Sequence, residues 1–234
     1  MNYCIIMPRL ARDNNASYAF PVGIAYVSSS LKATKRNVIT YNLNYKDGTT
    51  EELLRNLIQE HDIDVIASGG LTFQYPELRE IFELSKKIKP DITTWVGGGI
   101  ITASPIPAME ALEYADYGMI GEGEITICEL AEAMEGKRTF ESVDGLIYRK
   151  SDTNKWHITN PRQEIQDLDS IPFPDYEGFE YEKLLDKANF ELSGEDCGMV
   201  SFSRSCPFNC TFCFHPSGSK YRKRSLKSIL EEID

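Results

Sequence analysis

Three closely spaced cysteines are the residues of this sequence best suited to chemistry. Cys206, Cys210 and Cys213 follow a C-x3-C-x2-C spacing within one short segment. Three thiolates this close together can bind three corners of a cubane iron–sulfur cluster, in which each iron normally takes one cysteine. The remaining iron is then open to a small molecule, and an open metal position is typical of catalytic rather than structural sites.

Zinc binding and a disulfide are the alternatives to a cluster at these cysteines. Zinc could bind them with His215 as a fourth ligand, but His215 lies very close to Cys213, and no second C-x2-C pair of the kind zinc favours is present. A disulfide is disfavoured because we expect no secretory signal, and reduced cytosolic thiols rarely pair. Elsewhere, Cys4 and Cys128 lie in apolar patterns typical of buried residues, and the role of Cys197 stays open.

Composition and charge exclude several classes of function. The chain has 234 residues, of which 41% are hydrophobic, and a formal net charge of −11. This acidic balance argues against a general nucleic-acid binder or a membrane-surface protein, because both would carry a basic face. No apolar stretch approaches the length of a membrane span. We therefore expect a cytoplasmic protein that binds neither nucleic acid nor membrane.

Short apolar runs alternate with helical patterns over the first 140 residues. Strands are predicted at Tyr3–Met7, Val38–Asn42, Asp64–Ser68, Thr93–Val96 and Tyr117–Ile120. Helices are predicted at Pro21–Lys35, Thr50–Glu60, Pro76–Lys89, Ile106–Glu113 and Ile125–Met134. This alternation predicts an α/β fold, a doubly wound parallel five-stranded sheet of the Rossmann or flavodoxin kind, with helices on both faces.

Glycine clusters follow three successive strands of this predicted sheet. The candidate cofactor-binding residues there are Ser68, Gly69, Gly70, Thr72, Gly97, Gly98, Gly99, Gly121, Glu122 and Gly123. Any one glycine is explained by a tight turn, but ligands of parallel sheets bind at the carboxyl ends of the strands, so three clusters there favour binding. A dinucleotide fingerprint is excluded, because the first strand is followed by no glycine before Gly23.

The rest of the chain divides into a linker and a second unit. Val143–Arg149 and Trp156–Thr159 predict a β-hairpin, a proline-containing connector follows, and residues 180–190 predict a helix. A strand is then predicted at Gly198–Ser203, a solvated basic loop at residues 220–224 and an amphipathic helix at Ser225–Ile233. The predicted domains are residues 1–142, 143–196 and 197–234.

Several segments resemble the radical S-adenosylmethionine (SAM) enzymes that carry a cobalamin-binding domain. In the cysteine run the match includes Phe212 and the preceding Ser203-Arg204, and residues 21–26, 96–99 and 116–124 are similar to the cobalamin-binding domain that precedes the catalytic barrel. The resemblance implies that Cys206, Cys210 and Cys213 ligate a 4Fe-4S cluster whose open iron binds SAM, with Phe212 against the adenine. It also implies an external electron donor, such as flavodoxin or ferredoxin, and cleavage of SAM to a 5′-deoxyadenosyl radical.

The sequence departs from the family pattern at two places. Ser205 stands where the family often has glycine, so the turn into the first cysteine is expected to differ slightly. Cobalamin domains that ligate cobalt through histidine carry a DxHxxG loop after the first strand, whereas residues 8–20 contain no histidine. The resemblance therefore implies cobalamin without a protein histidine ligand.

The implied function is that of the N-terminal part of a radical SAM enzyme acting on an unidentified small molecule by methylation, cyclisation or rearrangement. Residues 197–234 are expected to hold only the first strand and the cluster loop of its barrel, so this stretch alone is not expected to be catalytically competent. Two alternatives stay open. One is a radical SAM protein whose first domain does not bind cobalamin, and the other is a non-catalytic cobalamin- or tetrapyrrole-binding module.

Overall fold

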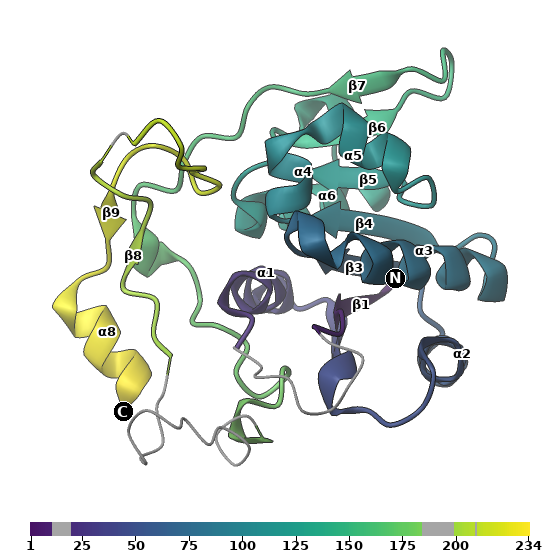
Figure 1. Ribbon diagram of the computed structural model, residues 1–234, viewed down its shortest axis with the longest axis horizontal. Coiled ribbons are helices and arrows are strands. Elements are labelled where there is room, and N and C mark those ends of the chain that lie inside the picture. The colour runs from purple at the N-terminus through teal and green to yellow at the C-terminus, as the bar shows by residue number, and fades with distance from the viewer. Residues whose placement is uncertain (11–19, 184–198, 209) are drawn as a thin grey trace.

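A seven-stranded sheet forms the centre of the molecule (Figure 1). The structure is a computed structural model that describes residues 1–10, 20–183, 199–208 and 210–234. Its strands are β1 (Asn2–Met7), β2 (Asn37–Asn42), β3 (Val65–Gly69), β4 (Thr93–Gly97), β5 (Tyr117–Met119), β6 (Leu146–Arg149) and β7 (Trp156–Ile158). They lie in the order β2-β1-β3-β4-β5-β6-β7.

The first five strands are parallel, which confirms the predicted five-stranded parallel sheet. The predicted hairpin β6–β7 is not separate from it, because β6 pairs antiparallel with β5 and extends the sheet at that edge. Leu146 and Ile147 are fully buried in this position. Burial of these apolar side chains against the sheet explains why the hairpin joins the first unit instead of the linker.

Helices cover both faces of the sheet, as predicted. They are α1 (Val22–Ala33), α2 (Thr50–His61), α3 (Tyr75–Ile88), α4 (Gly99–Ala103), α5 (Pro105–Ala111) and α6 (Gly123–Met134). Tyr3 and Trp95 belong to the core on the side of α1 and α6, while Phe82 of α3 belongs to the core on the opposite side. The helix predicted at Ile106–Glu113 corresponds to α5. The short helix α4 before it was not predicted, and Ser104 separates the two, with Pro105 starting the second.

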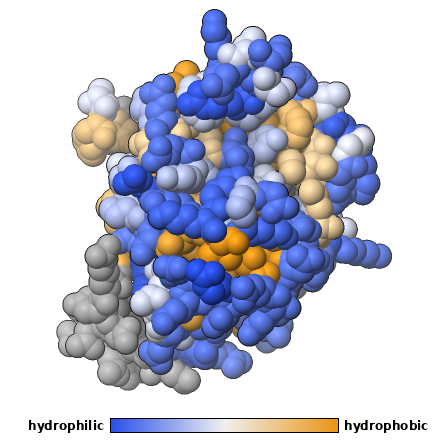
Figure 2. All heavy atoms as spheres, turned by 90° about the vertical axis from the view of Figure 1, so that its right-hand side faces the viewer, coloured by the Kyte–Doolittle hydropathy of each residue, from blue (hydrophilic) through white to orange (hydrophobic). Residues whose placement is uncertain are grey.

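The surface helices follow local signals that the sequence contains. Thr49 caps α2 and forms a capping box with Glu52, and Asp62 ends the same helix in the left-handed conformation. Pro76 lies in the first turn of α3. On the face at the right of Figure 1, mainly hydrophilic side chains surround a small apolar area (Figure 2). None of the helices in the described part of the chain is long and apolar enough to cross a membrane.

Glu135, just after α6, is expected to make stability depend on acid pH. Arg36 donates to both of its carboxylate oxygens, at 2.7 and 2.9 Å, and this contact, with smaller contributions from Lys137 and Tyr3, lowers the pKa of Glu135 to about 2. A pKa lower in the folded than in the unfolded chain adds stability above the unfolded pKa, and this stability is lost as the pH falls from about 5 toward 2. Urea unfolding measured across this range should show the loss, and Arg36→Gln should make it shallower. Parallel curves for the two proteins would contradict this assignment.

The C-terminal part forms a small second sheet and a helix. The sheet pairs β8 (Ser203–Arg204) with β9 (Arg222–Lys223), and α8 (Leu226–Ile233) follows with Ser225 as its cap. The strand predicted from residue 198 is shorter than expected, because residues 199–202 have no ladder partner and only Ser203–Arg204 pairs. Most of the helix predicted for residues 180–190 lies outside the described residues.

Candidate functional site

A cavity of about 640 Å³ opens at the carboxyl edge of the parallel strands. The chain order reverses between β1 and β3, and in this type of sheet such a reversal leaves a crevice in which ligands bind. The predicted residues that line it are Ser68, Gly69, Gly70, Gly97, Gly98, Gly99, Gly121, Glu122 and Gly123. Thr72 does not line the cavity, because it lies in the short 3-10 helix η2 (Thr72–Gln74) with an exposed side chain.

Bare backbone forms one wall of this cavity, made by Gly69, Gly70, Gly97 and Gly98, which we call the glycine floor. A Cβ atom added to Gly98 would lie 2.7 Å from the Gly70 carbonyl oxygen, and one added to Gly69 would lie 2.8 Å from that of Gly97. Gly98 also has a φ of +88°, which side-chain-bearing residues rarely adopt. Neighbouring strand ends are therefore packed too closely for side chains, and a ligand here would meet the main chain directly.

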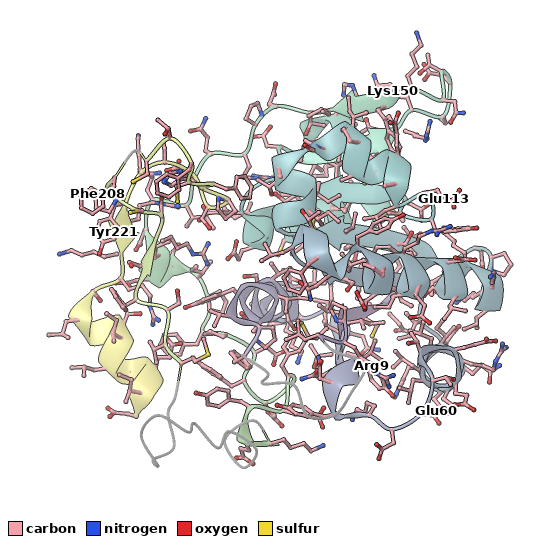
Figure 3. All side chains as sticks on the ribbon, viewed as in Figure 1. Arg9, Glu60, Glu113, Lys150, Phe208 and Tyr221 are labelled. Carbon is pink, nitrogen blue, oxygen red and sulfur yellow. The ribbon has the colours of Figure 1, made fainter. Side chains whose placement is uncertain are left out.

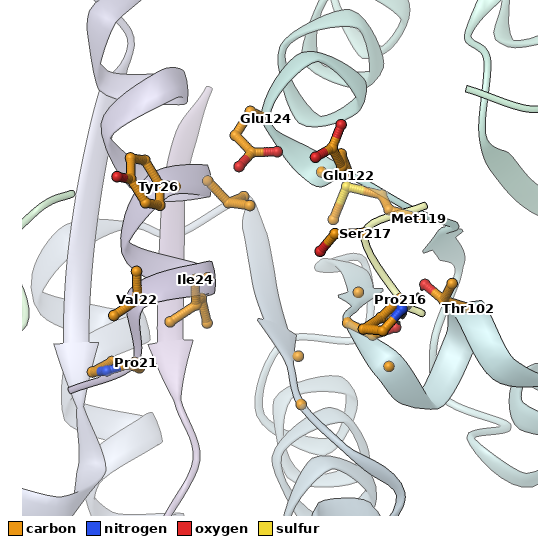
Figure 4. A pocket seen from close by; sticks show the side chains of 18 of the residues that line it. Pro21, Val22, Ile24, Tyr26, Thr102, Met119, Glu122, Glu124, Pro216 and Ser217 are labelled. Carbon is orange, nitrogen blue, oxygen red and sulfur yellow. Dashed lines mark hydrogen bonds between the residues drawn. The ribbon is translucent and has the colours of Figure 1, made fainter. Parts of the chain in front are cut away.

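Apolar side chains form the other walls (Figure 4). One wall comes from the start of α1 and contains Pro21, Val22, Ile24 and Tyr26. It faces Met119 and Thr102, and Pro216 and Ser217 lie beside Thr102. A mostly apolar lining with a few polar groups is typical of cofactor sites. The α1 residues were not among the predicted site residues, although residues 21–26 carry part of the resemblance to the cobalamin-binding domain.

Two carboxylates and two arginines join the sheet edge to the cysteine segment, and we call these four residues the glutamate–arginine cluster. Glu122 and Glu124 lie in the turn and the helix that follow β5, while Arg204 and Arg222 lie opposite each other in β8 and β9. Arg204 donates to Glu122 at 2.9 Å and also to Glu124, and Arg222 donates to both Glu122 oxygens at 3.0 and 2.9 Å. Three of the four are buried, and the Arg204 side chain is only 12% exposed.

The charged groups of the glutamate–arginine cluster are paired with one another by hydrogen bonds. Burial alone would raise the pKa of Glu122, but hydrogen bonds from Arg222, the Ile165 amide and Arg204 hold it below its ordinary value. Arg204 also lies over the Tyr26 ring, 5.1 Å from its centroid. Glu122 therefore lines the cavity as a carboxylate whose two oxygens are already engaged by the protein.

The prediction of a solvated basic loop at residues 220–224 is wrong for its arginines. Arg222 and Arg224 are 7% and 5% exposed. Arg224 donates to Glu232 and to the Ser228 carbonyl oxygen, so it holds α8 against this segment. The sequence shows the charges but not their distant partners, and an arginine becomes buried where a carboxylate meets it.

The three motif cysteines lie in the loop between β8 and β9. Cys206 is half-buried, Cys210 and Cys213 are exposed, and all three are free. In the part of the chain that the structure describes, no three His, Cys, Asp or Glu side chains are gathered so as to hold a metal. Phe212 is 90% exposed and does not line the cavity, although Ser203, Arg204 and Ser205 before the cysteines do.

Ser205 shows how the turn before the first cysteine forms without glycine. Its φ is +64°, the left-handed conformation that favours glycine, and its hydroxyl donates to the Gly218 carbonyl oxygen at 2.6 Å. Serine therefore adopts a glycine-like turn here and closes the base of the loop. Phe208 and Tyr221 lie on its outer side, away from the central sheet (Figure 3).

The remaining cysteines differ from the motif. Cys4 is buried, as predicted, and burial raises the pKa of its thiol. Cys128 is half-buried, and burial raises the pKa of its thiol to about 11. Both are therefore poorly suited to act as thiolate ligands. Cys197 lies outside the described residues.

Comparison with known proteins finds a matching family model and several similar sequences. Residues 8–131 match the model of the B12 binding domain family. An uncharacterized methyltransferase of Pyrococcus horikoshii is 28% identical over 219 residues, which cover 91% of this chain and 45% of that protein. Anaerobic magnesium-protoporphyrin IX monomethyl ester cyclase of Rubrivivax gelatinosus is 26% identical, over 92% of this chain and 38% of its own length. The chain thus spans less than half the length of these relatives.

Solved structures share the fold. The radical SAM methyltransferase TsrM from Kitasatospora setae, with cobalamin and a [4Fe-4S] cluster bound, superposes with a TM-score of 0.74 at 18% identity, over 100% of this chain and 45% of that one. The cobalamin-dependent SAM radical enzyme OxsB with aqua-cobalamin bound superposes with a TM-score of 0.79 at 20% identity, over 100% of this chain and 31% of that one.

Proposed function

Because the chain belongs to the B12-binding domain family, we propose that the cavity at the carboxyl edge of its sheet binds cobalamin as part of a radical SAM enzyme. The observation that carries the proposal is the glycine floor. Side chains there would collide with neighbouring backbone, so the strand ends leave a crevice in which a ligand can contact the main chain. The position of the crevice, at the β1–β3 reversal, is where ligands of this fold bind.

The lining residues suit a cofactor that is partly apolar and rich in hydrogen-bonding groups. The glycine floor provides close backbone approach, and Val22 and Ile24 give another wall an apolar surface. No histidine is found among the described residues of the lining, so cobalt would receive no imidazole from them. When bound, cobalamin would supply a cobalt centre able to carry a methyl group, which suits methylation, one of the three reaction classes implied by the resemblance.

Filling the cavity from Gly23 gives a direct test of cobalamin binding. Gly23 lines the cavity on α1, and a Cβ atom added there meets no atom within 4 Å, so the protein has room for a side chain. We expect Gly23→Phe to abolish binding of hydroxocobalamin and Gly23→Ala to preserve it, as measured by gel filtration with the absorption of the corrin. Circular dichroism would show that both variants are folded.

The outcome would also separate the alternatives. If the folded wild-type protein does not bind hydroxocobalamin, a radical SAM protein without cobalamin replaces the present proposal. Equal binding by Gly23→Phe and wild type would place the ligand outside this cavity. A nitrogen superhyperfine splitting in the electron paramagnetic resonance spectrum of bound cobalt(II) would contradict the absence of a histidine ligand.

We further propose that Cys206, Cys210 and Cys213 ligate a 4Fe-4S cluster with an open iron for SAM, and that Phe212 contacts the adenine. All three thiols are free, and residues 203–205 place their loop beside the cavity. Because the three side chains are not gathered in the described structure, cluster binding would draw them together, as metal binding commonly does. The electrons for this chemistry would come from an external donor such as flavodoxin or ferredoxin.

Anaerobic reconstitution with iron and sulfide tests this second part. We expect about four irons per chain and a broad visible absorption band. Replacing Cys206, Cys210 and Cys213 together by alanine should abolish both signals, whereas alanine at Cys4 and Cys128 should leave them. One zinc per chain with no iron–sulfur signal would overturn the assignment.

A further inference from the structure

Gln74 carries a buried hydrogen-bond donor with no partner among residues 1–10, 20–183, 199–208 and 210–234. Gln74 is the last residue of the short helix η2, and it is only 5% exposed and lines the cavity. The Oε1 atom accepts a hydrogen bond from the Leu71 amide at 3.0 Å. The Nε2 atom has no hydrogen-bond partner among the residues that the structure describes. Buried polar groups are normally paired, so an unused amide beside a cavity indicates a missing partner.

The orientation of this amide follows from its surroundings. Turning it over would place the NH2 group against the Leu71 N–H, so that two donors would face each other. The Gln74 carbonyl oxygen therefore accepts from Leu71, and the NH2 group is available to donate to another molecule.

The glycine floor holds Gln74 in place. A Cβ atom on Gly70 would lie 2.7 Å from the Gln74 Cδ atom, and one on Gly98 would lie 2.7 Å from the Gly70 oxygen. The Gln74 amide thus packs against the backbone of Gly70, and both residues line the cavity. A ligand that reaches this point meets both the bare backbone and one free donor.

We propose that the Gln74 amide donates a hydrogen bond to an oxygen or ring-nitrogen acceptor of the bound cobalamin. This inference rests on the proposed function and adds a recognition residue that the sequence pattern did not indicate. Two parts of cobalamin carry such acceptors, the nucleotide tail and the amide arms of the corrin ring. An uncharged donor fits either, and cobinamide, which lacks the nucleotide, distinguishes them.

The experiment compares Gln74→Glu and Gln74→Met with wild type. Gln74→Glu keeps an oxygen for the Leu71 amide but loses the free donor, and Gln74→Met keeps the length of the side chain without either. Gln59→Glu, at an exposed position of α2, is the matched control. Dissociation constants would be measured for hydroxocobalamin and for dicyanocobinamide, with the melting temperature of each protein free and bound.

We expect both Gln74 variants to bind hydroxocobalamin about tenfold more weakly, as for the loss of one buried hydrogen bond. Gln59→Glu should bind as wild type does. Ligand-free Gln74→Met should melt at a lower temperature, because the Leu71 amide loses its acceptor. In both variants the further rise in melting temperature on adding cobalamin should shrink. A loss confined to hydroxocobalamin assigns the acceptor to the nucleotide tail, and one shared with cobinamide assigns it to a corrin arm.

Unchanged affinity for both ligands in both variants would overturn the role of Gln74 and leave the proposed function intact. A folded wild-type protein that binds neither ligand would overturn both.

Discussion

Replacing Arg222 with alanine is expected to destabilise the protein by about 3–5 kcal/mol, the range for breaking a buried ion pair. Arg222 is 7% exposed and donates to both oxygens of Glu122 and, at 2.8 Å, to the Ile165 carbonyl oxygen. Without it, the partners that the described residues still offer this buried carboxylate are Arg204 and the Ile165 amide. Urea unfolding at neutral pH would measure the loss.

Two comparisons separate this effect from loss of an ordinary surface charge. Glu113→Ala removes a partner of Arg79 in an ion pair whose side chains are 57% and 45% exposed, and it should change the free energy of unfolding very little, because water screens both charges. The double variant Glu122→Leu with Arg222→Met should recover much of the stability lost by Arg222→Ala, because it leaves no uncompensated charge between those two residues. A loss with Arg222→Ala as small as that with Glu113→Ala would show that the glutamate–arginine cluster is not a significant stabilising contact.

Gly98→Ala is expected to have the second large effect, on both stability and cobalamin binding. Gly98 has φ +88° and ψ −169°, a backbone region that is essentially restricted to glycine and costs other residues about 1–3 kcal/mol. The new Cβ atom would also lie 2.7 and 2.8 Å from the Gly70 oxygen and nitrogen, which cannot move as easily as a side chain. We expect a total loss of about 3 kcal/mol or more.

Gly121→Ala provides the matched control for Gly98→Ala. Gly121 has a similar φ of +80°, but a Cβ atom there meets nothing within 4 Å. Gly121→Ala should therefore introduce backbone strain without a steric collision, and it should lower the free energy of unfolding less than Gly98→Ala does. Hydroxocobalamin binding, measured below the unfolding transition, should be weakened more by Gly98→Ala, since Gly70 supports Gln74. Equal effects of the two substitutions would mean that the packing of Gly98 on Gly70 is unimportant.

Local sequence patterns were sufficient to predict most helices and strands of residues 1–142. The alternation of apolar runs and helical patterns predicted the five parallel strands within a residue or two at each end, because strand and helix periods are properties of short segments. The short helix α4 was missed, since it begins at the last of three glycines, which favour a turn over a helix. The resemblance to cobalamin-binding radical SAM proteins is confirmed by the family match and by the relatives.

The sequence by itself determined where glycines follow strands, that no histidine occupies residues 8–20, and that three thiols lie close together. Only the tertiary structure decided which charges meet, because Glu122 and Arg222 are 100 residues apart and no local signal relates them. It likewise joined the hairpin to the sheet through the pairing of β6 with β5, and turned Gln74 instead of Thr72 toward the cavity. Such outcomes depend on long-range register and burial, which set the free energy of a contact only once the whole sheet has formed.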